Sequence, residues 1–471
     1  MMRRHVTFDL GTTRLKVACF DETGRVLGQV SRRHVERRDG DRQWQSADAW
    51  WQDCIDGYHE LCKTSGMSTA AATGFSLSGR AGAAIGVNTD HSVTVDPWQD
   101  SRHSAALAPL LDQGVPLYAA TLAAKYAWLK THEPEVADDV SRLLYAKDFL
   151  LFRLTGEAIT DPSSGPDGVN WPAGIETVVP AELLPRVRLP WKLAGQVSEI
   201  AARQLGCKPG LPVATGAHDG ICANIGAGAT SDASYALTLG THAVVRTPHR
   251  DEMPGVNRFY CFPPDRHAYG ANALFAGRAL DWVLDQLTEA SGESARAAAF
   301  AKFGAGLAGQ DIRLTPHFFP YLKGQIAPER HTHRRAAFAG LSLGHASLDL
   351  FHGAVLGVTF AVAENIAALS RAIPPNGNLR ATGGGTLLAA WVGYLATLTE
   401  RPISVTDASV EGRGAAMCLA VACGDHPDIE TAAKHMIPEA RVVEPVSPEH
   451  GVLAEKFAEW RAARDAHYAG P

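Results

Sequence analysis

Two segments far apart in this 471-residue chain share one pattern: a short alternating strand, a turn that contains Gly-Thr, and a second strand. The first copy covers residues 6–20 and turns at residues 11–13, and the second covers residues 234–247 and turns at residues 240–242. Alternation that is broken by turn residues is typical of antiparallel hairpins. Around the first copy it continues to residue 30, which predicts a three-stranded antiparallel meander. A hairpin that recurs about half a chain apart favours two domains of related design.

Both halves of the chain mix helix-period and strand-period segments, so we predict an α/β protein. A chain of 471 residues with 46% hydrophobic composition favours two or three domains. The boundary is expected within residues 226–233, which are small and polar, and this gives domains of residues 1–230 and 231–471. The predicted helices cover residues 122–130, 149–154, 277–287 and 348–369, and the predicted strands cover residues 213–215 and 379–382.

The charge balance argues against a polyanionic partner. The chain has 44 basic and 50 acidic residues, a net charge of −6, and no concentration of basic residues that would neutralise a phosphate backbone. We therefore expect no nucleic-acid partner.

The cysteines and the N-terminal residues indicate the compartment. The 8 cysteines lie far apart without a C-x-x-C pair, so we expect reduced, buried thiols rather than a disulfide scaffold. Asp9 lies where a signal peptide would need an apolar core, and no apolar run approaches the ~20 residues of a membrane span. The sequence predicts a soluble, cytoplasmic protein without a membrane partner.

The Gly-Thr turns are candidate phosphate sites. Such a turn leaves several backbone N–H groups pointing the same way, and glycine lacks the Cβ that would block a close approach. Asp9 comes just before the first turn, where its carboxylate would repel phosphate unless a cation lay between them. Mg²⁺ commonly takes one or two carboxylates together with substrate phosphates, so Asp9 is a candidate magnesium ligand, with a turn-forming role as the alternative. The sequence has neither the G-x-x-x-x-G-K-[ST] motif of P-loop enzymes nor a strand-linked G-x-G-x-x-G.

An ordered set of motifs between about residue 8 and residue 424 resembles the FGGY carbohydrate kinases, a branch of the actin-like ATPase superfamily. In chain order the motifs are Phe8-Asp9-Leu10-Gly11-Thr12-Thr13 with Lys16, Lys125-Tyr126-Ala127-Trp128-Leu129-Lys130, residues 148–161, Pro212 through Asp219 to Gly228, Leu239-Gly240-Thr241, and Ala381-Thr382-Gly383-Gly384-Gly385. The resemblance implies two actin-like (ribonuclease H-like) domains with an ATP and substrate cleft between them. It also implies ATP-dependent phosphorylation of a hydroxyl of a sugar, sugar acid or polyol.

The resemblance assigns roles to individual residues. Asp219 matches the family's catalytic base, which accepts the proton of the attacking hydroxyl, and Asp9 would hold Mg²⁺. Because Asp before an apolar helical run is a good cap, the alternative for Asp219 is a helix N-cap. The residues that would bind ATP are Gly11, Thr12, Thr13, Gly240, Thr241, Gly384 and Gly385.

Three departures from the family's pattern affect these expectations. His242 stands where serine is usual in the second phosphate motif, and Thr386-Leu387-Leu388 follow the glycines where small or polar residues are usual. Both leave the details of ATP binding open. Ala81-Gly82 replace the Met-His pair that xylulose kinases and many gluconate kinases carry, so two side chains that would contact the acceptor are missing.

The resemblance places Ser78, Arg80, Trp98 and Asp100 at the acceptor, together with Asp219. The tryptophan of this pattern packs on the carbon face of the acceptor, and the aspartate accepts from its hydroxyls. Arg80 offers a fork of donors suited to a carboxylate or to vicinal hydroxyls, and a solvated surface arginine is the alternative. Ketopentoses, gluconate-like sugar acids and linear polyols all stay open as acceptors.

A competing class is a non-catalytic actin-like module that uses ATP to switch conformation or senses a sugar. Related sugar-responsive repressors carry a helix-turn-helix, for which we expect no room before the first hairpin. After Gly424 only about 47 residues remain, fewer than a separate peptide-binding domain needs. The presence of Asp9 and Asp219 favours catalysis, and a homodimer is the base-rate expectation for assembly.

Overall fold

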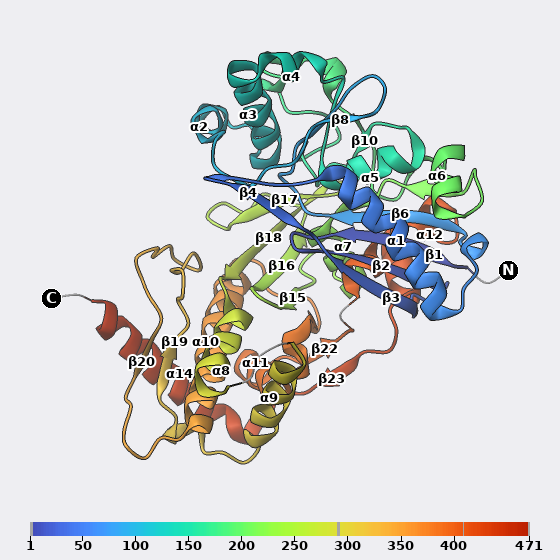
Figure 1. The fold of residues 1–471 in the computed structure, drawn as a ribbon. Coiled ribbons are helices and arrows are strands. Elements are labelled where there is room, and N and C mark those ends of the chain that lie inside the picture. Colours follow the sequence, from blue (N-terminus) through green and yellow to red (C-terminus); the bar gives the residue numbers. More distant parts are fainter. Residues whose placement is uncertain (1–2, 290–292, 408, 470–471) are drawn as a thin grey trace. The chain divides into compact units, whose positions relative to one another are not determined.

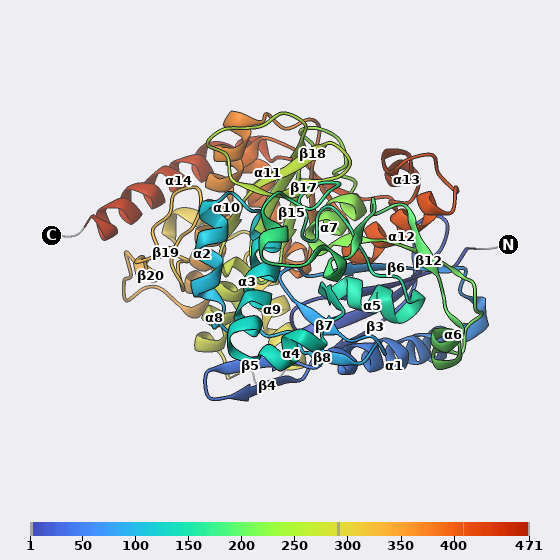
Figure 2. The same ribbon diagram turned by 90° about the horizontal axis from the view of Figure 1, so that it is seen from above.

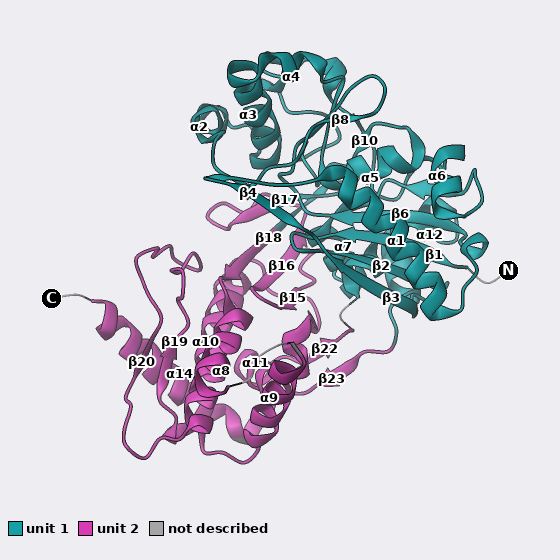
Figure 3. Cartoon of the chain, viewed as in Figure 1, with its two compact units in different colours: residues 1–230, 260–268, 409–438 teal, residues 231–259, 269–408, 439–471 magenta. Residues whose placement is uncertain are grey.

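The computed structural model describes residues 3–289, 293–407 and 409–469, and the chain forms two compact units (Figures 1 and 3). Unit 1 contains residues 1–230, 260–268 and 409–438, and unit 2 contains residues 231–259, 269–408 and 439–471. The chain leaves unit 1 after residue 230 and returns to it twice. Unit 1 is therefore completed by segments that a single boundary at residue 230 assigns to the other half.

The central sheet of unit 1 has the strand order β12-β13-β6-β1-β2-β3, with β14 beside β6. The predicted meander is confirmed, because β2 pairs antiparallel with both β1 and β3. Strand β6 runs parallel to β1, and β14 runs parallel to β6, so the carboxyl ends of β1, β6 and β14 meet at one edge. The strands are β1 (His5–Leu10), β2 (Arg14–Phe20), β3 (Val26–Arg33), β6 (Gly74–Gly79), β12 (Leu193–Gln196), β13 (Pro212–Ala214) and β14 (Ala217–His218).

Helices cover both faces of this sheet, which explains why β1 and β6 are buried along their whole length. Figure 2 shows α1 and α5 on one side of the sheet and α7 and α12 on the other. The helices of unit 1 are α1 (Ala47–Ser65), α2 (Ser104–Asp112), α3 (Leu117–His132), α4 (Pro134–Asp139), α5 (Ala146–Thr155), α6 (Glu199–Leu205), α7 (Asp219–Ala227), α12 (Val410–Ala422) and α13 (Ile429–His435). Its smaller strands are β4 (Glu36–Asp39), β5 (Arg42–Gln45), β7 (Ile85–Val87), β8 (Val93–Val95), β9 (Arg142–Leu144), β10 (Ile159–Thr160) and β11 (Arg186–Val187).

Unit 2 contains the second predicted hairpin and the predicted strand 379–382, and both are confirmed. Strands β15 and β16 pair antiparallel around the Gly-Thr turn, and β21 runs parallel to β15. Strands β22 and β23 follow beside β21. The strands are β15 (Ala236–Leu239), β16 (Ala243–His249), β21 (Leu379–Thr382), β22 (Ile403–Val405), β23 (Arg441–Val443), β19 (His317–Phe319) and β20 (Ala337–Ala339), while β17 (Arg258–Phe262) and β18 (Arg266–Ala273) span the points where the chain passes to unit 1 and back.

The helices of unit 2 are α8 (Ala276–Leu287), α9 (Glu293–Gly306), α10 (Ser347–Ala372), α11 (Ala389–Thr399) and α14 (Ser447–Tyr468). Helix α10 is long and apolar enough to cross a membrane, contrary to the expectation that no segment of the chain is. However, 78% of the most apolar 18-residue stretch of this helix is buried inside the protein. Its apolar residues therefore form a core helix, and they pack with α8, α11 and the strands of unit 2.

Candidate active site

The shared edge of β1, β6 and β14 brings together the predicted catalytic residues of unit 1. In the sheet, Ser78 of β6 is paired with Asp9 of β1 on one side and with Ala217 of β14 on the other. The next residues beyond this edge are the first Gly-Thr turn after β1, Arg80 after β6, and Asp219 after β14. Parallel pairing thus brings together, from three distant parts of the sequence, the predicted phosphate turn, a cation and a carboxylate.

Asp9 is almost fully buried, with 6% exposure. Its Oδ1 atom accepts a hydrogen bond from Ser78 Oγ at 2.8 Å, and its Oδ2 atom lies 3.7 Å from Lys16 Nζ. Lys16 also lies 3.4 Å from Glu411 Oε2. Burial raises the pKa of Asp9 to about 7, the charges of Glu411 and Asp219 raise it as well, and Lys16 opposes them. A further cation would stabilise the ionised carboxylate.

The surroundings of Asp9 fit a magnesium ion held jointly by protein and nucleotide. Within residues 3–289, 293–407 and 409–469, no group of three or more His, Cys, Asp or Glu side chains could hold a metal by itself. Mg²⁺ often uses one or two carboxylates and fills its other positions with phosphate oxygens and water. A single buried carboxylate beside a phosphate turn meets that requirement.

Asp219 is the first residue of α7, and the N-cap of this helix is His218. His218 Nδ1 accepts a hydrogen bond from the Gly220 N–H at 3.1 Å, so the interpretation of Asp219 as the cap is wrong. Because Nδ1 accepts, a neutral His218 carries its proton on Nε2, which lies 3.2 Å from Asp219 Oδ1. The His218 ring lies between Tyr118 and Tyr260, with centroid distances of 5.6 and 4.6 Å. His218 thus orients a carboxylate whose side chain is still 38% exposed.

Helix α12 fixes the position of α7. A Cβ atom on Gly226 would lie 1.9 Å from the Val410 carbonyl oxygen, and a Cβ atom on Gly414 would lie 2.0 Å from the Cys222 carbonyl oxygen. Glycine at both positions lets the two backbones touch. The segment 409–438 therefore supports the helix that carries Asp219, and it also contributes Glu411 to the surroundings of Lys16.

Three of the predicted acceptor residues, Ser78, Trp98 and Asp100, are engaged in contacts within unit 1. Ser78 has no exposed surface and donates to Asp9, and Trp98 is 4% exposed. The Asp100 carboxylate accepts two hydrogen bonds of 2.6 Å from Arg102 and one of 2.9 Å from the Gln43 N–H. Arg102 lowers the pKa of Asp100, so this carboxylate is ionised and paired before any acceptor binds.

Arg80 is not a solvated surface arginine. Its guanidinium lies 5.2 Å above the Trp50 ring, and its Nη2 atom is 3.4 Å from Gln45 Oε1. Gln45 also accepts from Trp50 Nε1 and donates to the Thr12 carbonyl oxygen. Burial lowers the pKa of Arg80 to about 10, against the opposite effect of Asp219. Arg80 is therefore held in one orientation, and Gln45 links it to the first phosphate turn.

The second Gly-Thr turn lies against the start of α8. The Gly240 N–H donates to the His242 carbonyl oxygen at 2.9 Å, and the Arg278 N–H donates to the Thr241 carbonyl oxygen at 3.2 Å. A Cβ atom on Gly277 would lie 2.1 Å from the Gly240 carbonyl oxygen, so glycine is required for this approach. His242 Nδ1 accepts from the Phe275 N–H at 3.1 Å. The unusual histidine thus ties the turn to the residue before α8.

The glycine loop at residues 383–385 follows β21, whose parallel pairing with β15 brings this loop and the second Gly-Thr turn to one edge. Gly384 is exposed, and a Cβ atom there would meet nothing within 4 Å. Thr386 Oγ1 donates to the Gly383 carbonyl oxygen at 2.7 Å, and Leu387 is 85% exposed. Thr386 therefore closes the loop, and the open backbone is at Gly384.

Comparison with known proteins identifies the family. The N-terminal domain model of the FGGY family of carbohydrate kinases matches residues 5–168, and the C-terminal domain model of the same family matches residues 236–423. The chain belongs to this family. The resemblance inferred from the motifs is thereby confirmed, and so is the expectation that the protein is a phosphotransferase.

Relatives cover nearly the whole length of this FGGY kinase. The xylulose kinase of Staphylococcus epidermidis is 25% identical over 480 residues, covering 96% of this chain and 95% of that protein. The gluconokinase of Bacillus subtilis is 23% identical over 435 residues, covering 85% of this chain and 83% of that protein. The crystal structure of a xylulose kinase from Lactobacillus acidophilus has a TM-score of 0.84 at 19% identity and covers 99% of both chains. The predicted two-domain α/β fold is confirmed.

Proposed function

We propose that this FGGY kinase transfers the γ-phosphate of ATP to a hydroxyl of a sugar or sugar acid, with Asp219 as the general base. The observation that carries the proposal is the shared edge of β1, β6 and β14. There an accessible carboxylate at the start of α7 follows the same edge as Asp9 and the first Gly-Thr turn. Phosphoryl transfer needs such positioning and charge stabilisation more than it needs covalent chemistry.

In the proposed step, Asp219 accepts the proton of the acceptor hydroxyl as the hydroxyl oxygen attacks the γ-phosphorus. The bond between the γ-phosphorus and the β–γ bridging oxygen breaks, and ADP leaves with that electron pair. His218 Nε2, which lies 3.2 Å from Asp219 Oδ1, would keep the base oriented before the acceptor arrives. The product is a phosphate monoester and a protonated Asp219.

The phosphates of ATP would be bound by backbone N–H groups and hydroxyls of the two Gly-Thr turns. Thr12, Thr13 and Thr241 are exposed, so their donors are accessible to a nucleotide. Gly384 offers open backbone on which the nucleoside could lie. Magnesium, when bound through Asp9, would neutralise the charge that develops on the phosphates. Because the proposed contacts come from both units, turnover would need both.

Two relatives with different acceptors support a carbohydrate substrate in general rather than one sugar. Their names, xylulose kinase and gluconokinase, cover a ketose and a sugar acid. Sugar kinases of this kind act on soluble metabolites, which is consistent with a cytoplasmic enzyme.

The test of the proposal is ADP release by purified protein with ATP and Mg²⁺ across ketoses, aldonates and polyols. We expect at least one acceptor to stimulate ADP release, and we expect EDTA to abolish the stimulation. ATP binding without stimulation by any acceptor would contradict the kinase and favour the sensor alternative.

A further inference from the structure

We propose that the acceptor of this kinase is a sugar acid, and that its carboxylate binds between Arg80 and Lys125. The proposal rests on the function proposed above and names the substrate class of the same site. It follows from two cationic side chains of unit 1 that have no carboxylate within ion-pair distance among the described residues. The charge of Asp219 acts on one of them, Arg80.

Arg80 is a half-buried cation, and the described residues offer its guanidinium no paired anion. Across residues 3–289, 293–407 and 409–469 no carboxylate lies within ion-pair distance of its guanidinium, and its buried Nε–H has no hydrogen-bond acceptor. The contact with Gln45 Oε1 is long, at 3.4 Å. A buried charge and a buried donor are costly unless a partner is supplied. A carboxylate supplies both, because it accepts two parallel hydrogen bonds from an arginine fork.

Lys125 adds a second cation to this region. It is 3% exposed, and its Nζ atom donates to the carbonyl oxygens of Gly82 at 3.0 Å and Trp98 at 2.7 Å. Burial lowers the pKa of Lys125 to about 7, and the charge of Arg80 acts in the same direction. The two cations therefore destabilise each other, and an anion between them would stabilise both.

The other polar groups near the acceptor also favour a ligand that accepts hydrogen bonds. Asp100 is saturated by Arg102 and the Gln43 N–H, so it has little capacity left to accept from polyol hydroxyls. The buried Trp98 Nε1–H has no acceptor among the described residues. A carboxylate is acceptor-only when ionised, whereas a hydroxymethyl group would bring another donor and no charge.

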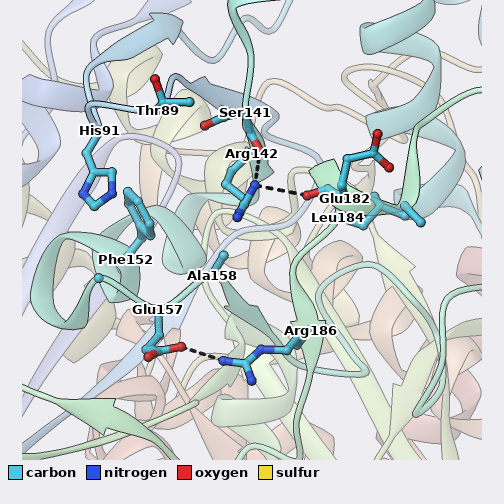
Figure 4. Close-up of a pocket in the computed structure, with 12 residues that line it drawn as sticks. Thr89, His91, Ser141, Arg142, Phe152, Glu157, Ala158, Glu182, Leu184 and Arg186 are labelled. Atoms are coloured by element: carbon cyan, nitrogen blue, oxygen red, sulfur yellow. Dashed lines mark hydrogen bonds and ion pairs between the residues drawn. The ribbon is translucent and has the colours of Figure 1, made fainter.

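Two arginines that line another pocket of unit 1 have hydrogen-bond acceptors within the protein. Figure 4 shows a pocket of about 530 Å³ in which Arg186 pairs with Glu157 at 2.6 Å. Arg142, in the same pocket, donates to the backbone carbonyl oxygens of Ser141 and Glu182. Arg186, whose charge is paired with a carboxylate, therefore provides a control for Arg80.

The experiment compares aldonates with the alditols of the same carbon skeleton: gluconate with glucitol, xylonate with xylitol, and erythronate with erythritol, with xylulose as the ketose. ADP release is measured for the wild type, Arg80→Gln, Arg80→Lys and Arg186→Gln at saturating MgATP. We expect the wild type to prefer at least one acid over its alditol by about 10²-fold in kcat/KM. Arg80→Gln should raise KM for that acid by about 10–100-fold with a smaller change in kcat, because the contact is distant from the reacting hydroxyl.

The variants separate loss of the contact from loss of the fold. Arg80→Lys keeps the charge but not the fork, so we expect it to retain part of the preference. Arg186→Gln should retain all of it. Wild-type kcat/KM higher for xylulose or an alditol than for every acid overturns the proposal, and so does an acid preference that survives in a folded Arg80→Gln.

The outcome also distinguishes the inference from the function on which it rests. If a ketose or an alditol stimulates ADP release and no acid does, the kinase function is supported and the sugar-acid inference is overturned. If Asp219→Asn keeps its turnover and still prefers the acid over its alditol, the Arg80 subsite is supported and the assignment of Asp219 as the general base is overturned. No stimulation by any acceptor overturns both.

Discussion

The hairpin of β1 and β2 and the hairpin of β15 and β16 share a Gly-Thr turn but differ in what surrounds it. Two residues before the turn, the first hairpin has Asp9 opposite Lys16, and the second has Thr238 opposite Val244. Thr238 Oγ1 accepts a hydrogen bond of 2.7 Å from Arg246, and no carboxylate occupies the corresponding position. The same turn thus lies beside a carboxylate and a lysine in unit 1, where we propose that it binds phosphate together with magnesium, and beside neutral side chains in unit 2.

The largest expected difference between the hairpins is in catalysis. Asp9→Asn removes the charge that would hold magnesium, so kcat should fall by about 10²–10³-fold. The matched change in the second hairpin, Thr238→Ser, keeps the hydroxyl for Arg246 and should change kcat less than about twofold. Steady-state kinetics against Mg²⁺ concentration measure both. Equal losses in the two variants would contradict the division of roles.

Asp9→Asn should also stabilise the protein in the absence of metal and nucleotide, because burial disfavours the ionised form of the Asp9 carboxylate. The pKa of Asp9 is about 7 when folded and 3.8 as the reference value. The folded state therefore binds this proton more tightly, and stability falls as pH rises between those two values. Asp9→Asn should raise the free energy of unfolding at pH 8 by on the order of 2 kcal/mol, with no gain at pH 4. Denaturant unfolding without metal or nucleotide measures this, and equal stability at pH 8 would contradict the raised pKa.

The threonines of the two turns should contribute similarly to phosphate binding. Thr12→Ala and Thr241→Ala each remove one hydroxyl that would donate to a charged phosphate, so each should lower kcat/KM for ATP by about tenfold. Kinetics at varied ATP and saturating acceptor measure the loss. If only one variant were affected, the two turns would not act as a pair.

The smallest expected effect concerns His242, which has no counterpart in the first turn. His242→Ser restores the residue usual in the family but is too short to accept from the Phe275 N–H. Leaving that donor without its partner should cost about 1 kcal/mol of stability, with less than about threefold change in kcat. Thermal unfolding compared with that of His333→Ser, a change at an exposed histidine of unit 2, measures the difference. Unchanged stability would show that the Phe275 contact contributes nothing.

Local pattern was sufficient to predict much of the fold. The meander, the second hairpin and the strand 379–382 all follow from alternation next to glycine turns, and the structure has them at those residues. Alternation works here because each strand pairs with a neighbour only a short turn away, or has one face buried by helices.

Contacts between segments that are distant along the chain could not be predicted from the sequence. Glu411 lies 395 residues from Lys16 along the chain, and the packing of α12 on α7 and on the central sheet brings it near Asp9. Gln45 connects Arg80 to Thr12 from a strand with no motif of its own. Lys125 lies within a motif that the sequence shows, but its proposed role as a second cation depends on burial that no local pattern reports.

The most direct test of the account is turnover of Asp219→Asn with the best acceptor found for the wild type, alongside Asp112→Asn, an exposed aspartate of the same unit. The account predicts that Asp219→Asn keeps its shape and its ATP affinity but loses about 10²–10⁴-fold in kcat, because the hydroxyl proton has no base to accept it. Asp112→Asn should match the wild type. Most of the wild-type turnover surviving in Asp219→Asn would contradict the account.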